Sequence, residues 1–256
     1  MPQLEPTITG ERSLRADGVW RLWRYLEDTT VVDPLTEIAQ ARAAGHAFGA
    51  FQAHLAGLAG PRLGNTIPGF LELAHYLREF DAVADAAPRA ERRLIDTHRH
   101  LADVLGERNA YIHGDCKINN LLFDANAERV VAVIDFDTVM YGHWAWDFGD
   151  LVRSASFSQG GVDVSLFAAC LEGFARHQSR ITVDAAVLAP SYVTVMLGVR
   201  FLSDHLSGDR YFRVSRRGEN LQRAREQFAL LADLTSHGAA FRDAAVAVLE
   251  STAAPD

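Results

Sequence analysis

The sequence has little cysteine, no long apolar run and no excess of positive charge, and each of these absences excludes a class of protein. Its two cysteines, Cys116 and Cys170, are far apart and form no CxxC pair, which excludes a disulfide framework and a cysteine-based zinc site. No apolar run reaches the roughly 18 residues of a membrane span. The first residues also lack the basic-then-apolar pattern of a secretory signal. We therefore expect a cytoplasmic protein without a membrane partner.

The balance of charge argues against a nucleic-acid partner. The net charge is −8 at pH 7, whereas a protein that grips phosphates along a nucleic acid needs a surplus of Lys and Arg. Apolar residues make up 48% and charged residues 23% of the 256 residues, which is enough apolar surface for a full core. The length allows one large domain or two small ones.

The first third of the chain predicts two short strands, a helix and a loop. Residues 6–14 and 19–25 alternate in polarity on either side of the turn at 16–18, a pattern typical of paired strands. Asp33-Pro34 predicts the cap and first residue of a helix whose apolar positions run at a period near 3.6 to Leu55. The glycine- and proline-rich residues 57–69 predict a loop.

The remainder of the chain is mainly helical in pattern. A helical region from about Leu71 to Leu105 is broken at Pro88, and from Trp146 onward the pattern is helical with breaks near positions 160, 179 and 208. Between these regions, Leu121–Phe123 and Val130–Ile134 predict a hairpin. We therefore expect an α+β fold: a mainly helical body that carries a small hairpin and follows a remnant of sheet.

Polar residues flank both strands of the predicted hairpin. His-Gly-Asp-Cys-Lys-Ile-Asn-Asn, residues 113–120, precedes the first strand, and Ile-Asp-Phe-Asp, residues 134–137, closes the second. Paired strands lie about 4.8 Å apart, so the turn brings the Asn120 amide and the Asp135 carboxylate toward one small volume. Asp115, on the loop that leads in, faces the same opening.

This order of residues is typical of phosphoryl transfer. Kinases use a catalytic-loop Asp as base, an Asn five residues later and a second Asp after the next strand, and the last two bind magnesium. The order predicts Asp115 as the base, with Asn120 and Asp135 as magnesium ligands. Lys117 would neutralise charge on the transferred phosphoryl group. A short acidic loop or a strand-end carboxylate alone is commonly a turn or cap, but the conjunction favours catalysis.

The same residues resemble a known family. HGDCKINN followed by IDFD is similar to the signature of the aminoglycoside phosphotransferase and choline kinase superfamily, a branch of the protein-kinase fold. The resemblance runs from about residue 20 to 225. It implies a protein-kinase-like large lobe, residues 29–256, after a remnant of the small-lobe sheet and hinge, residues 1–28. It also implies ATP and Mg²⁺ as cofactors and a small-molecule hydroxyl as acceptor.

The resemblance also implies functions for individual residues. His113 would be a structural residue of the catalytic loop, and Asp147 would brace that loop through its backbone amides, although an ordinary helix cap is an alternative for Asp147. Residues 22–28 resemble the hinge that touches adenine through its backbone, which makes Tyr25 and Glu27 candidate nucleotide contacts. The interpretation leaves the oligomeric state open.

Within the superfamily, the motifs are most similar to those of N-acetylhexosamine 1-kinases, including IDFDTVMYG, WDFGDLVR and RFLSDHLSGDRYF. That similarity makes Asp137, Arg200 and Tyr211 candidate sugar contacts. A surface salt bridge is the alternative for Arg200, and a core position is the alternative for Tyr211. Several arginines in the carboxyl-terminal half favour a neutral or anionic sugar over a cationic acceptor.

The sequence departs from the family where phosphates are held. It contains neither a G-x-G-x-x-G loop nor a P-loop motif, and we find no counterpart of the strand lysine. We therefore expect most of the small lobe to be missing. The leading hypothesis is a sugar kinase acting on an anomeric hydroxyl. The alternatives are an aminoglycoside or amino-alcohol kinase, a catalytically silent fragment or pseudoenzyme of the same fold, and an all-helical scaffold.

Overall fold

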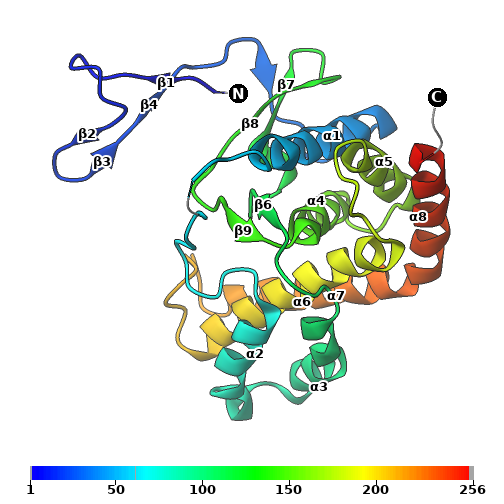
Figure 1. The fold of residues 1–256 in the computed structure, drawn as a ribbon. Helices are drawn as coiled ribbons and strands as arrows, with labels where there is room; N and C mark the ends of the chain where they lie inside the picture. The colour runs from blue at the N-terminus through cyan, green and yellow to red at the C-terminus, as the bar shows by residue number, and fades with distance from the viewer. Residues whose placement is uncertain (1, 61, 254–256) are drawn as a thin grey trace.

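The computed structural model describes residues 2–60 and 62–253 as a mainly helical body from which a short strand-rich segment projects (Figure 1). The helices are α1 (Ile38–Leu55), α2 (Leu73–Asp81), α3 (Arg89–His98), α4 (Trp144–Gln159), α5 (Val164–Ala175), α6 (Val183–Leu206), α7 (Glu219–Ser236) and α8 (Gly238–Ala253). The strands are β1 (Leu4–Glu5), β2 (Leu14–Arg15), β3 (Val19–Trp20), β4 (Leu22–Trp23), β5 (Thr29–Thr30), β6 (Ala110–Ile112), β7 (Leu121–Asp124), β8 (Val130–Val133) and β9 (Met140–Gly142). The expected α+β class with a helical majority is confirmed.

Residues 2–28, here called the arm, fold back on themselves away from the helices (Figure 1). Strand β1 pairs with β4 and β2 pairs with β3, both antiparallel, with the turn at residues 16–18. Each pairing extends over two residues per strand. The turn at residues 16–18 and the antiparallel pairing beside it are confirmed. The predicted strand over residues 6–14 is wrong, because only Leu14 of that range is in a strand and β1 lies before it.

The predicted hairpin is present and carries a third strand. Strands β7 and β8 are antiparallel, with Leu121 opposite Val133, and β5 adds to the outer edge of β7 in the order β5-β7-β8. Asp124 Oδ1 accepts the backbone N–H of Glu128 at 3.0 Å, which closes the turn. The ends of the hairpin that carry the polar motifs therefore lie next to each other.

The first helix begins later than the sequence predicted. It starts at Ile38 with Glu37 at the cap position, so the assignment of Asp33 as cap and Pro34 as first helical residue is wrong. The cause is the side chain of Gln40, whose Oε1 accepts the N–H groups of Thr36 at 3.1 Å and Glu37 at 3.3 Å. These bonds satisfy donors that a helix end leaves free, and so they fix the start there.

Helices α1 and α5 approach until their backbones touch. A Cβ atom on Gly45 would lie 2.0 Å from the carbonyl oxygen of Cys170, and one on Gly173 would lie 2.1 Å from that of Arg42. Only glycine fits at such a separation. Because α1 also packs against β6, β8 and α4, this contact fixes a platform beneath the residues around position 113.

Helix α6 runs through the core between α2, α4, α7 and α8 (Figure 1). It is the one helix in the described part of the chain that is long and apolar enough to cross a membrane by length and composition. Within the fold, 67% of that apolar window is buried. Burial of this kind is what a central core helix of a globular protein shows. Its carboxyl-terminal half brings Arg200 to the site described below.

Candidate functional site

Three polar side chains of the loop at residues 113–120 are bonded to one another. Lys117 Nζ lies 2.9 Å from Asp115 Oδ2. Asn120 Nδ2 donates to the same carboxylate oxygen at 3.1 Å and to the Asp115 carbonyl at 2.8 Å. Asn120 is buried, whereas the Asp115 and Lys117 side chains are 24% and 43% exposed. The loop therefore presents a carboxylate and an amine to solvent while an amide holds the carboxylate from below.

A buried carboxylate holds the loop backbone. Asp147 lies in the first turn of α4, and its two oxygens accept the N–H groups of His113 and Gly114, each at 2.8 Å. Gln52 of α1 donates to Asp147 Oδ2 at 2.8 Å. Burial raises the pKa of Asp147, while the nearby His113 and these donors oppose that rise. The cap of α4 is the side chain of His143, which accepts the N–H of Ala145, so the cap alternative for Asp147 is wrong.

The imidazole of His113 ties the loop to the end of the hairpin. It is fully buried, and its Nε2 donates to the Ile134 carbonyl at 2.9 Å while its Nδ1 accepts the Asp115 N–H at 3.3 Å. The edges of the Phe48 and Phe51 rings pack against it. The Ile134 N–H in turn donates to the Asn120 carbonyl at 3.0 Å. The backbone that leads into Asp135 is thus fixed by both His113 and Asn120.

Gly114 lets the loop turn back on the segment that follows the hairpin. Its φ of +83° is left-handed, and a Cβ there would lie 2.7 Å from the carbonyl oxygen of Thr138. The Thr138 hydroxyl donates to the His113 carbonyl at 2.8 Å. A glycine between His113 and Asp115 is therefore required by close backbone approach as well as by conformation.

The candidate residues line two cavities. Asp115, Lys117 and Arg200 line the first, of about 540 Å³, which extends along α4, α6 and α7. Asp135 and Tyr25 line the second, of about 710 Å³, which lies between the arm and the hairpin. We call them the acceptor cavity and the arm cavity.

The remaining candidate residues do not all lie in the cavity where the sequence analysis would place them. Asp137 lines the arm cavity with Asp135, so the structure does not bring it together with Arg200 and Tyr211. Glu27 is exposed and is not part of the wall of the arm cavity. Tyr211 is 60% exposed, so its interpretation as a core residue is wrong.

The donor set around the hairpin fits magnesium by its chemistry. Asn120 uses its Nδ2 on Asp115, which leaves its amide oxygen for another partner, and Asp135 is exposed at the cavity wall. Magnesium accepts one or two such oxygens together with phosphates and waters. Among the described residues, there is no group of three or more His, Cys, Asp or Glu side chains that could hold a metal ion. A magnesium ion here would therefore need ligands from phosphates and waters as well.

The side chain of Arg200 is buried among aromatic rings, which the sequence did not predict. Its side chain is only 9% exposed and forms no ion pair with any residue that the structure describes, so the surface salt bridge is wrong. Its Cζ instead lies 4.8–5.4 Å from four aromatic ring centroids. These rings come from Phe70, Tyr76, Tyr211 and Phe212.

Sequence reasoning missed Gln52 and most of the aromatic residues around Arg200. Gln52 had a usable indication, because it is a polar residue among the apolar positions of the first predicted helix. The aromatic residues had none, since they come from segments more than 100 residues apart in the sequence, as the numbers 70 and 212 show. Their convergence depends on how α2 packs against α6.

Comparison with known proteins gives one match in sequence and several in structure. The sequence model of the phosphotransferase enzyme family matches residues 4–182. The crystal structure of a choline/ethanolamine kinase family protein from Mesorhizobium loti is 18% identical with a TM-score of 0.63, over 94% of this chain and 78% of that one. An aminoglycoside phosphotransferase from Alicyclobacillus acidocaldarius is 15% identical with a TM-score of 0.60, over 98% and 77%.

A third structure, the GDP complex of aminoglycoside 2′-phosphotransferase-IIIa, is 16% identical with a TM-score of 0.57, over 89% of this chain and 75% of that one. At these identities the three structures show that the fold is shared. They do not extend the resemblance to N-acetylhexosamine 1-kinases, which stays a prediction.

Proposed function

This chain belongs to the phosphotransferase enzyme family, and from that premise we propose that it transfers the γ-phosphoryl group of ATP to a hydroxyl group of a small molecule. The observation that carries the proposal is the position of Asp115. Its carboxylate opens onto the acceptor cavity, while Asn120 supports it and Asp147 accepts the backbone N–H groups of the two preceding residues, His113 and Gly114. A base fixed in this way orients a hydroxyl for in-line attack.

Each residue of the loop then has a defined task. The acceptor oxygen forms a bond to the γ-phosphorus, the bond to the oxygen that bridges the β- and γ-phosphates breaks, and Asp115 takes the hydroxyl proton. Lys117, 2.9 Å from that carboxylate, is close enough to offset negative charge on the transferred group. Asn120 and Asp135 would hold Mg²⁺, which when bound neutralises the nucleotide phosphates.

The arm cavity is our candidate for the nucleotide site. Tyr25 and Leu26 line one side of it and Asp135 lines the other, so an adenine at the arm would place its phosphates toward the hairpin. Glu27 stays a candidate through its backbone. The GDP bound to aminoglycoside 2′-phosphotransferase-IIIa supports a nucleotide in a protein of this fold.

For the acceptor we propose a sugar, with the anomeric hydroxyl of an N-acetylhexosamine as the first candidate. The support is the similarity of residues 113–124, 134–142 and 200–212 to the motifs of those kinases. In that proposal Arg200 and Tyr211 contact the sugar, whereas Asp137, which lines the arm cavity, is left without a sugar contact. An amino alcohol or an aminoglycoside is the alternative, because proteins named for such acceptors share the fold.

The decisive experiment compares the wild-type chain with Asp115→Asn and with Asp243→Asn, an exposed control on α8. A coupled assay follows ADP release with N-acetylglucosamine, N-acetylgalactosamine, kanamycin and choline as acceptors. We expect Asp115→Asn to lower kcat by about 10²–10⁴-fold, since it removes the base and keeps the shape. The control should keep full activity.

Unchanged turnover in Asp115→Asn would refute the assignment of the base. If the wild-type protein binds ATP but turns over no acceptor, the result would favour the alternative of a catalytically silent pseudoenzyme of the same fold. The acceptor with the highest kcat/KM decides between the sugar and the amino-alcohol or aminoglycoside proposals.

A further inference from the structure

The guanidinium of Arg200 is a buried charge without a counter-ion. The residue is 9% exposed, and none of the described Asp and Glu side chains lies within ion-pair distance of it. Its nitrogen atoms make no hydrogen bond to a described residue, and they reach solvent through the cavities that Arg200 lines. A largely buried charge without an ion pair is costly. An anion in one of these cavities would lower that cost.

Four aromatic rings surround this guanidinium. The Cζ atom lies 5.3 Å from the ring centroid of Phe70, 4.8 Å from Tyr76, 5.4 Å from Tyr211 and 5.2 Å from Phe212. Cation–π contacts offset part of the cost of burial, but a guanidinium carries five N–H donors that aromatic ring faces leave without strong acceptors. We call these four rings the Arg200 cage.

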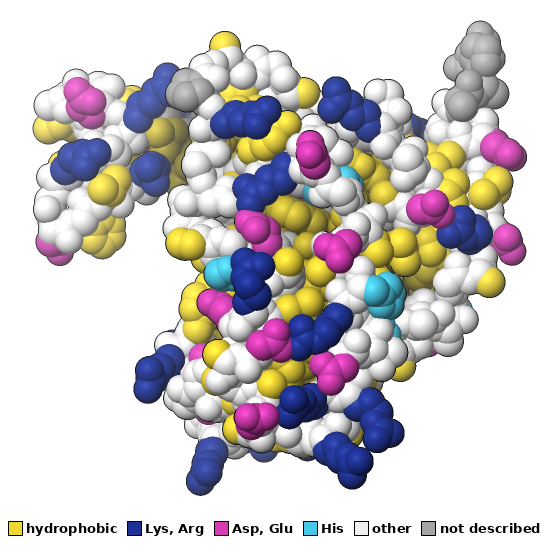
Figure 2. Space-filling view, turned by 60° about the horizontal axis from the view of Figure 1, so that its bottom comes forward, with side chains coloured by type: hydrophobic (Ala, Val, Ile, Leu, Met, Phe, Trp, Pro, Cys, Tyr) yellow, Lys and Arg dark blue, Asp and Glu magenta, His cyan; other side chains and the backbone are white. Residues whose placement is uncertain are grey.

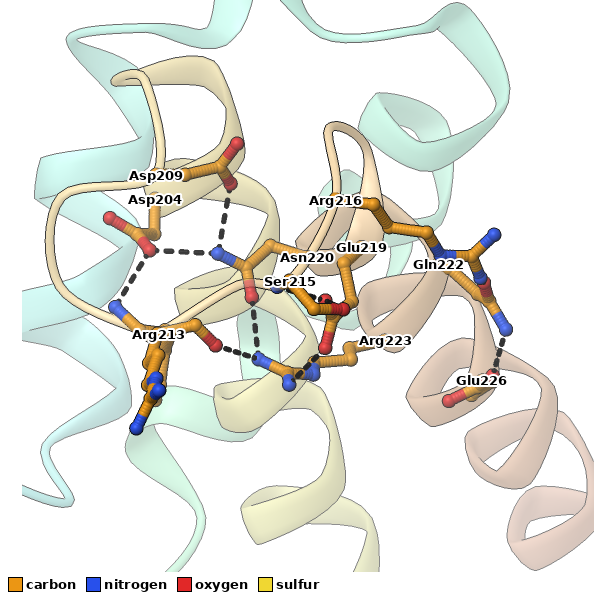
Figure 3. A network of polar contacts seen from close by, with 11 residues as sticks. Asp204, Asp209, Arg213, Ser215, Arg216, Glu219, Asn220, Gln222, Arg223 and Glu226 are labelled. Atoms are coloured by element: carbon orange, nitrogen blue, oxygen red, sulfur yellow. Dashed lines mark hydrogen bonds and ion pairs between the residues drawn. The ribbon is translucent and has the colours of Figure 1, made fainter.

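Two cage residues are held in place by a network that involves no ligand. Asp204 accepts the N–H groups of Tyr211 at 2.8 Å and Phe212 at 2.9 Å. Asn220 donates to Asp204 and to Asp209, each at 2.9 Å (Figure 3). The loop between α6 and α7 is thus fastened at both ends. The cage is preformed, so a ligand would not have to order it.

Most other charged side chains of the acceptor cavity are paired. Arg153 Nη2 lies 2.7 Å from Asp150 Oδ1, Lys117 lies 2.9 Å from Asp115, and Arg223 pairs with Glu219. Asp33 and Glu226 also line this cavity, and both are exposed. The buried charge in this wall that has no ion pair with a described residue is that of Arg200.

Arg200 also lines a second cavity, of about 470 Å³, beside α2. The hydroxyl of Ser203 lines it as well and is buried without a hydrogen-bond partner. The Tyr76 hydroxyl also lies in this wall, and burial raises its pKa to about 12. Two carboxylates line this wall: Glu79 is paired with His75 at 3.3 Å, and Asp204 accepts backbone N–H groups and the Asn220 amide. Uncommitted donors therefore surround Arg200 on this side too.

We propose that Arg200 binds an anionic group, a carboxylate or a phosphate, of the acceptor. The inference rests on the proposed phosphoryl transfer to a sugar, and it replaces the neutral N-acetylhexosamine by an acidic sugar as the first candidate acceptor. A guanidinium in a fixed fork matches both of these oxyanions. The geometry also disfavours a quaternary ammonium or aminoglycoside amine, since the protein's own cation occupies the ring faces that such a group would use and repels it.

Equilibrium binding tests this without requiring turnover. Titration calorimetry on the full chain compares two matched pairs, N-acetylglucosamine with N-acetylglucosamine 6-phosphate and glucose with glucuronate, in addition to choline. We expect the anionic member of at least one pair to bind about 10-fold or more tightly than its neutral partner, which corresponds to about 1.4 kcal/mol or more. Choline should bind more weakly than either sugar pair.

Variants assign the effect to Arg200. Arg200→Gln should abolish the preference for the anionic member, whereas Arg210→Gln, which removes an exposed charge from the neighbouring loop, should retain it. If Arg200→Gln does not fold, Arg200→Lys keeps the charge without the planar fork and should reduce the preference severalfold. Equal binding of neutral and anionic sugars, absence of binding by both pairs, or a preference retained in the Arg200 variants would overturn the inference.

A competition experiment identifies the source of the anion. Inorganic phosphate should compete at least 10-fold more weakly than N-acetylglucosamine 6-phosphate, and equal competition would overturn the assignment to an acceptor. Because these measurements need no ATP, loss of phosphoryl transfer would count against the proposed function and leave the binding result intact.

Discussion

The loop at residues 113–120 and the arm are held in place by different kinds of contact. Residues 113–120 receive buried hydrogen bonds from α1, α4 and the end of the hairpin, through Gln52 and Asp147 and through Ile134. The arm is held by two-residue pairings and an exposed ion pair, and its Trp20, Trp23 and Tyr25 side chains are 45–83% exposed. Figure 2 shows it standing apart from the body, with apolar and basic side chains next to each other on its surface.

This difference in packing distinguishes the acceptor side of the proposed reaction, at Asp115, from the nucleotide side, at the arm. The geometry around Asp115 is imposed by the body and does not involve the arm, so the acceptor side is preorganised. The contact between an arm side chain and the hairpin end is an edge-on packing of Trp23 against Phe136, with ring centroids 6.1 Å apart. We therefore expect perturbations of the body to be far more costly than perturbations of the arm.

The largest effect should come from removing the brace. Asp147→Ala leaves three buried donors, on Gln52, His113 and Gly114, without an acceptor. We expect a loss of about 3–5 kcal/mol in the free energy of unfolding, measured by urea denaturation. Phosphoryl transfer should fall as well, because Asp115 loses its fixed backbone.

Asp243→Asn, on the exposed face of α8, is the matched control and should change stability by less than about 0.5 kcal/mol. Equal losses in the two variants would show that the loop does not depend on Asp147, and the contrast with the arm would then fail.

A smaller effect should follow acidification. Burial lowers the pKa of His143, the cap of α4, from 6.5 to about 4. The neutral imidazole is favoured in the fold, so its contribution is present above pH 6.5 and is lost as the pH falls toward 4. The loss should reach about 3 kcal/mol, since one pKa unit corresponds to about 1.4 kcal/mol.

His143→Asn isolates this contribution, because asparagine keeps a side-chain cap but does not titrate in this range. The variant should unfold with a shallower pH dependence between pH 6.5 and 4 than the wild type. Parallel curves for the two proteins would rule out His143 as the source.

The smallest effect should come from the arm. Arg24 and Glu5 form an ion pair at 2.7 Å, but their side chains are 62% and 35% exposed. Charge-removing substitutions, Arg24→Gln and Glu5→Gln, should each change the free energy of unfolding by less than about 1 kcal/mol, with a coupling energy near 0.5 kcal/mol in a double-mutant cycle. A coupling of several kcal/mol would remove the distinction between the arm and the loop.

The hairpin and its polar ends could be predicted because their determinants are local. Two short apolar runs around a turn predict β7 and β8, and strand spacing then brings Asn120 next to the backbone of Ile134. The bracing position of Asp147 was implied by family resemblance, whereas a cap was the reading from local pattern. The functional assignments themselves remain predictions until assayed.

The determinants that the sequence did not reveal are side-chain contacts over long distances. Helix α1 begins at Ile38 because the Gln40 side chain caps the preceding residues, and no propensity rule required that choice over Pro34. The Arg200 cage depends on residues from two distant segments, and the division of the site into two cavities separates Asp137 from Arg200. Local patterns carry no information on such packing.

The ion pair between Lys117 and Asp115 has a practical consequence. Lys117 is the one lysine among the 256 residues, and its side chain is 43% exposed. An amine-directed acylating reagent therefore has a single lysine target among these residues, the ε-amino group beside the proposed base. Peptide mass spectrometry of the acylated protein becomes a single-position probe: the extent of labelling at Lys117 reports occupancy of the reaction centre without any engineered tag.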